Sequence, residues 1–114
     1  MNQDTFAQEM AELLSPFGTM RIRKMFGGYG IYANGLMMAL IAYDKLYFKA
    51  NAAAKNYFEQ CGSQPFVYEA HGKRATMSYW QAPEDLADDH QELKKWFDLA
   101  YAAAVEQKNK KRAT

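Results

Sequence analysis

The dipeptide Asn34-Gly35 constrains the fold more than any other feature, because it stands between two apolar segments, 31–33 and 36–43. Both residues tolerate the positive φ angles of a type I′ turn, and an Asn-Gly pair between apolar runs is a strong signal for a β-hairpin. Strands joined by two residues pair antiparallel. The sequence therefore predicts an antiparallel sheet around this turn.

Further strands are predicted on both sides of this hairpin. Residues 20–25 alternate with the period of a half-buried strand, which places Arg21 and Arg23 on one face. Asp44-Lys45 predicts a tight reversal into a strand over 46–49. The segment from Met20 to Lys49 is therefore expected to fold as a four-stranded meander.

The segment Gly27-Gly28-Tyr29-Gly30 separates the first of these strands from the second. It resembles a phosphate-binding loop, but neither a Gly-Lys-Ser/Thr ending nor a helix follows it. Three glycines in four residues instead predict a bulge, or a bend where two backbones approach closely. A binding loop is the alternative interpretation.

Three helices are predicted from apolar residues that recur at three- and four-residue spacing. Asp and Asn residues stand where the helices begin, and these side chains are favoured as N-terminal caps. Asp4 is the expected cap of the first helix, whose apolar residues recur from Phe6 to Phe17 and which Ser15-Pro16 and Gly18 close. Asn51 is the expected cap of a helix over 52–60, and Asp88 or Asp89 that of the last helix.

Residues 66–69 and 75–80 are predicted to form a second hairpin with a turn at His71-Gly72. The order α-β(4)-α-β(2)-α predicts a two-layer α+β fold whose antiparallel sheet has about five to six strands. We expect one domain over 1–107 and a basic tail over 108–114. The tail holds four of the 14 basic residues, which leaves ten basic and 13 acidic residues in the body.

The sequence offers no catalytic or metal-binding motif. Cys61, the single cysteine, cannot form an internal disulfide and is interpreted as a small apolar residue at a helix end. His71 and His90 stand in no ligand spacing, and the acidic residues between 84 and 92 suit the start of a helix. We therefore expect no enzymatic activity, no metal and no cofactor.

The N-terminus lacks the pattern of a signal peptide, and the longest apolar run, from Gly35 to Tyr43, is far shorter than a membrane span. Together with the cysteine count, this predicts a cytoplasmic protein.

Arg21, Arg23 and Lys24, followed by Phe26 and Tyr29, form a basic cluster interleaved with aromatic residues. Cations bind phosphates and aromatic rings stack on bases, so the cluster is a candidate for nucleic-acid contact, with help from the basic tail. The same residues are also candidates for a protein contact or for an ordinary solvated strand face.

Tyr79 and Trp80 are further candidates, because both residue types are enriched at protein interfaces. Their position between the last strand and the last helix also suits a core role. Lys49 is expected to lie near the basic strand on the same sheet.

The segment 23–32, Arg-Lys-Met-Phe-Gly-Gly-Tyr-Gly-Ile-Tyr, resembles the N-terminal domain of the TfoX/Sxy family of natural-competence regulators. Segments 46–49, 65–68, 77–80 and 82–84 agree with the family in the same order. The resemblance covers nearly the whole chain.

This resemblance implies a secretion-chaperone-like α+β fold without enzymatic activity, and a regulator that acts with the transcription machinery or the cyclic AMP receptor protein. Full-length members carry a second, helical domain, so we expect a stand-alone form here. The leading hypothesis is transcription regulation through protein contacts; direct nucleic-acid binding and small-molecule binding are the alternatives. The hypothesised contact residues are Arg21, Arg23, Lys24, Phe26, Gly27, Gly28, Tyr29, Lys49, Tyr79 and Trp80.

Overall fold

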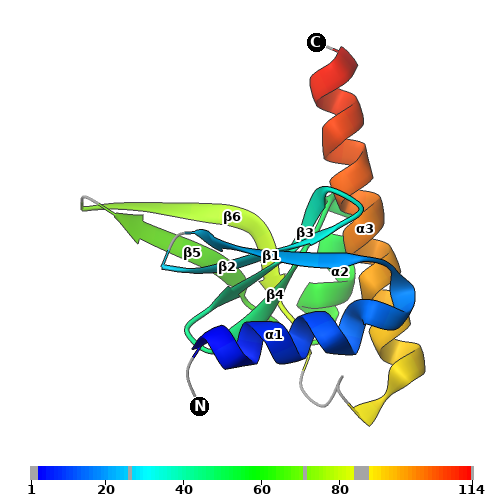
Figure 1. Cartoon of the computed structure of the whole chain (residues 1–114). Coiled ribbons are helices and arrows are strands. Elements are labelled where there is room, and N and C mark those ends of the chain that lie inside the picture. The colour runs from blue at the N-terminus through cyan, green and yellow to red at the C-terminus, as the bar shows by residue number, and fades with distance from the viewer. Residues whose placement is uncertain (1–2, 26, 71, 84–87, 114) are drawn as a thin grey trace.

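The computed structural model of the chain describes residues 3–25, 27–70, 72–83 and 88–113, and their elements follow the predicted order (Figure 1). The helices are α1 (Gln3–Leu14), which the 3-10 turn η1 (Ser15–Phe17) extends, α2 (Ala52–Gln60) and α3 (His90–Ala113). The strands are β1 (Met20–Met25), β2 (Gly28–Ala33), β3 (Leu36–Ala42), β4 (Lys45–Lys49), β5 (Pro65–Ala70) and β6 (Lys73–Gln81).

The strands form one antiparallel sheet in the order β1-β2-β3-β4-β6-β5. The first four strands are the predicted meander, and β6 pairs with β4 so that β5 becomes an outer strand. The α+β class, the antiparallel sheet and its six strands therefore confirm the predicted fold class.

The two hairpin turns of the meander differ in how well the sequence predicts them. Asn34 and Gly35 have φ angles of 51° and 84°, which confirms the predicted turn. The next turn is formed by Tyr43 and Asp44, at 54° and 58°, so the prediction of Asp44-Lys45 is wrong by one residue. The observed register keeps Leu46 opposite Ile41 and on the buried side, whereas a shift of one residue would turn Leu46 to the other face.

All three helices pack on one face of the sheet. α1 lies against β1 and β2, α3 against β3 and β4, and α2 against α3 and β6. In this layer the fully buried Ile31, Ile41 and Phe48 meet Leu93 and Trp96 of α3. This layer is the main hydrophobic core.

The opposite side of the sheet, which we call the open face, holds a second and smaller cluster of buried residues. Each of them comes from a strand, and no described helix contributes to the cluster. The Tyr47 and Phe66 rings meet edge-on with their centroids 5.1 Å apart. Besides this cluster, strand alternation places on the open face Arg21, Arg23, Tyr32, Met37, Lys49 and Met77.

Capping residues confirm two of the three predicted helix starts. Asn51 Oδ1 accepts a hydrogen bond from the Ala54 N–H at 2.9 Å, and Asp89 Oδ1 accepts one from the Glu92 N–H at 3.1 Å. α1 already begins at Gln3, so Asp4 lies inside its first turn and is not its cap.

The structure differs from the prediction at Cys61 and at the C-terminal basic segment. Cys61 caps the C-terminus of α2 but is exposed, because the helix buries only Ala54 and Phe58. α3 continues to Ala113, so the basic residues that follow position 107 extend this helix beyond the sheet (Figure 1). The domain boundary at 107 itself stays a prediction.

Candidate interaction surface

The structure divides the hypothesised contact residues between the two faces of the sheet. Arg21, Arg23, Lys49 and Tyr79 lie on the open face, whereas Tyr29 and Trp80 belong to the helix side. Phe26 lies outside the described residues, as do His71, Glu84 and Asp85. The candidate surface is therefore built from the open face alone.

Arg21 and Arg23 are exposed on β1, an outer strand of the sheet. They alternate with Met20 and Ile22, which pack towards the main core, so both guanidinium groups lie on the open face as predicted. The Arg23 guanidinium lies 5.7 Å from the centroid of the Tyr32 ring on β2. This distance is within the range of a cation–π interaction.

The aromatic residues Tyr29 and Trp80 help to form the main core. Tyr29 is buried in the main core, and the half-buried Trp80 packs against that core and stacks on Phe58 with ring centroids 6.1 Å apart. Phe58 also meets Trp96 of α3 at 4.5 Å. We therefore leave both residues out of the interaction surface, because their side chains belong to the main core on the helix side of the sheet.

The glycines of the predicted bend act through close packing rather than as a loop. Gly27 has a φ of 73° in the turn between β1 and β2, while Gly28 and Gly30 are strand residues. A Cβ atom on Gly28 would overlap the carbonyl oxygen of Ile41. The predicted close approach of two backbones is confirmed here, and the register shift in β2 comes later, between Ile31 and Tyr32.

Lys49 and Tyr79 pair across β4 and β6. Lys49 Nζ donates a hydrogen bond to Ser78 Oγ at 3.1 Å and lies 4.8 Å from the centroid of the Tyr79 ring. Both residues are buried, with Lys49 only 6% exposed. Burial raises the pKa of the Tyr79 phenol, and the phenol of Tyr32 raises it further.

Lys49 and Tyr79 belong to a groove of about 710 Å³ between the open face and the C-terminal half of α3. Its lining includes Met25, Met37, Met77, Lys49, Tyr79 and Lys108, which come from four strands and the helix. The sequence analysis missed this groove. The methionines are far apart in the sequence, and only the pairing of the strands brings them together.

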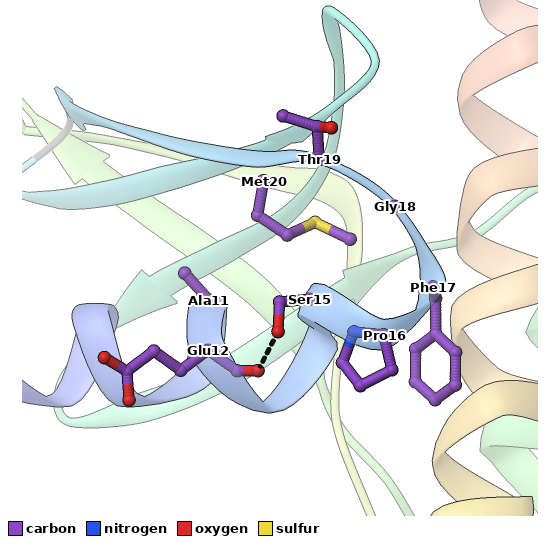
Figure 2. Close-up of a pocket in the computed structure, with 8 residues that line it drawn as sticks. All are labelled: Ala11, Glu12, Ser15, Pro16, Phe17, Gly18, Thr19 and Met20. Carbon is purple, nitrogen blue, oxygen red and sulfur yellow. Dashed lines mark hydrogen bonds between the residues drawn. The ribbon is translucent and has the colours of Figure 1, made fainter.

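A second hollow, of about 740 Å³, lies where α1 turns into β1 (Figure 2). Ser15 Oγ donates a hydrogen bond to the backbone oxygen of Glu12 at 2.7 Å. The Glu12 carboxylate is the only charged group in its lining, which also contains Pro16 and Phe17. This arrangement offers no convergent polar groups for a ligand.

Two further observations concern the described part of the chain only. Its His, Cys, Asp and Glu residues form no group of three that could hold a metal ion. None of its helices combines the length and the apolar character that crossing a membrane requires.

Comparison with known proteins identifies the family. The sequence profile of the TfoX N-terminal domain matches residues 12–104, and the chain belongs to this family. The chain is also 26% identical over 101 residues to Protein Sxy of Escherichia coli (strain K12). This alignment covers 86% of this chain and 47% of that protein. The chain thus spans about half the length of this curated relative. These matches confirm the resemblance seen in the sequence.

Proposed function

We propose that this chain is a non-enzymatic regulatory domain that acts in transcription regulation by binding another protein through its open face. The observation that best supports this proposal is the position of Arg21 and Arg23, which stay exposed beside the half-buried Tyr32 ring on the side opposite the helices. Arginine and tyrosine are among the residue types that are enriched at the energetic hot spots of protein interfaces.

Membership in the TfoX N-terminal domain family supports a regulatory role. By the resemblance described above, the partner is the cyclic AMP receptor protein or a component of the transcription machinery. Because the chain spans about half of the matched relative, the proposed contact concerns the matched half.

Charge favours a protein partner over duplex DNA. The body of the chain holds 13 acidic and ten basic residues, so its net charge repels the phosphate backbone. Duplex-binding proteins commonly neutralise several phosphates. On β1 the exposed cations are Arg21, Arg23 and Lys24, and the other basic cluster lies at the far end of α3.

The test is a direct binding measurement with purified components. The chain is titrated with the cyclic AMP receptor protein, with RNA polymerase and with labelled duplex DNA, each at low and at physiological salt. We expect one of the two proteins to bind, and we expect the Arg21→Ala/Arg23→Ala variant to weaken that binding about tenfold or more.

A matched control removes two positive charges from the helices instead. Lys55 and Lys94 are exposed on α2 and α3, and the Lys55→Ala/Lys94→Ala variant should bind like the wild type. Salt-sensitive DNA binding that depends on Arg21 and Arg23, without binding of either protein, would instead establish the nucleic-acid alternative. The absence of binding to all three would overturn the proposal.

A further inference from the structure

The groove beside α3 has the chemistry of a peptide-binding site. Met25, Met37 and Met77 line it, and methionine side chains adapt to partners of different shape. The groove is partly open to solvent, whereas pockets for small molecules enclose most of their ligand. An extended segment of another protein suits this shape better than an enclosed small molecule.

The charges of the groove select an acidic segment. Its lining contains Lys49 and Lys108 but neither aspartate nor glutamate. Glu106, the nearby carboxylate on α3, accepts a hydrogen bond from Asn51 at 2.8 Å and pairs with Lys110 at 3.2 Å. The charged side chains that line the groove are therefore both cations.

The two lysines differ in their surroundings. Lys108 is exposed on the rim, and the buried Lys49 amine lies beside the Tyr79 ring. A carboxylate that reaches the buried Lys49 amine would form a charge-assisted hydrogen bond, which is stronger than one between neutral groups. The site therefore combines apolar anchoring with recognition of negative charge.

We propose that this groove binds an extended acidic peptide segment with apolar side chains, presented by the protein partner. The inference rests on the proposed function and names the chemistry of that partner. Apolar side chains of the segment pack on the three methionines, and its carboxylates face Lys49 and Lys108.

The test uses a fluorescein-labelled peptide of alternating leucine and aspartate, about eight residues long, which reaches about 26 Å when extended. Fluorescence anisotropy measures its binding to the full chain. We expect saturable binding that weakens with salt. Replacing leucine by serine, or aspartate by lysine, should abolish it. If either replacement binds as well as the original, the proposal is overturned.

Two variants at exposed positions test whether the peptide occupies the groove. Gln107→Trp places a large ring at the groove, and Lys108→Glu reverses a charge on its rim. We expect the first to block binding and the second to weaken it about fivefold. The control variants Gln60→Trp and Lys55→Glu make the same changes at exposed positions of α2 and should leave the affinity unchanged.

Thermal unfolding of each variant confirms that it is folded. If Gln107→Trp and Lys108→Glu bind the peptide like the wild type, the groove is not the site. This result is distinguishable from failure of the proposed function, which is judged by binding of the cyclic AMP receptor protein or RNA polymerase. If the peptide binds in the groove but neither the cyclic AMP receptor protein nor RNA polymerase binds the chain, the proposed partners are wrong. The groove would still be a peptide-binding site.

Discussion

Lys49 and Tyr79 stand directly opposite one another on β4 and β6, and the lysine amine lies 4.8 Å from the centroid of the tyrosine ring. A buried cation beside a buried phenol forms the floor of the groove on the open face. The pair therefore has two roles: it joins β4 to β6 in the sheet, and it lines the groove that we propose for binding.

Burial of this tyrosine predicts that the protein loses stability in alkali. The pKa of Tyr79 in the folded state is raised above the ordinary value of 10.0, and so is that of Tyr47. The stability linked to these groups is complete below the pKa of the unfolded state and is lost as pH rises through the folded-state pKa. Urea unfolding between about pH 9 and 11 should show this decline. Tyr79→Phe should make it less steep, and an unchanged slope would contradict the assignment.

Gly28→Ala should destabilise the protein by about 3 kcal/mol, because the added methyl group overlaps the Ile41 carbonyl oxygen. Gly18→Ala is the control. Gly18 has an extended φ of 162°, and a Cβ atom there would meet its nearest neighbours at 3.9 Å. Chemical denaturation should therefore show a large loss for the first variant and little change for the second. Equal effects would contradict the close approach of β2 and β3.

The link between Asn51 and Glu106 predicts a change in titration. The hydrogen bond from Asn51 lowers the pKa of the Glu106 carboxyl below 4.5, and Lys110 lowers it further. Asn51→Ala should move this pKa upwards, which carbon-13 detection of the carboxyl group measures. Because the same change removes the cap of α2, it should also cost about 1 kcal/mol of stability. A Glu106 pKa that does not move would show that the two side chains do not interact in solution.

Trp80→Ala should act on stability rather than on binding. The indole stacks on the fully buried Phe58 in the main core, and its loss should lower the free energy of unfolding by about 3 kcal/mol. Tyr57→Ala is the control, because the Tyr57 side chain of α2 is 47% exposed. At a temperature where the Trp80 variant stays folded, its affinity for the partner should match that of the wild type. If the variant lost affinity for the partner but no stability, Trp80 would be part of the interaction surface after all.

The local signals of the sequence predict most of the fold. Asn34-Gly35, the alternation along β1 and the Asn51 cap each depend on a few neighbouring residues, and each is confirmed. The turn at Tyr43 was misplaced because a tyrosine rarely adopts a positive φ, and the pairing of Ile41 with Leu46 overrides that preference.

The candidate site was harder to predict because it depends on contacts between distant segments. The alternation along β1 indicates that Arg21 and Arg23 share a face, but it does not show which face the helices cover. From the sequence, Trp80 suits either an interface or the core. Its stacking on Phe58 of α2 assigns it to the core. The groove needs four strands and α3 in place, so its methionines carry no signal of their own in the sequence.

The most direct test of the open face as a protein-binding surface is a map of backbone amide signals in the nitrogen-15-labelled chain. The spectrum is recorded before and after addition of whichever purified protein binds, the cyclic AMP receptor protein or RNA polymerase. We predict that the changes concentrate at Arg21, Arg23, Tyr32 and Lys49, while the amide of Lys55 on α2 stays unperturbed. Changes confined to the exposed sides of the three helices would contradict the account.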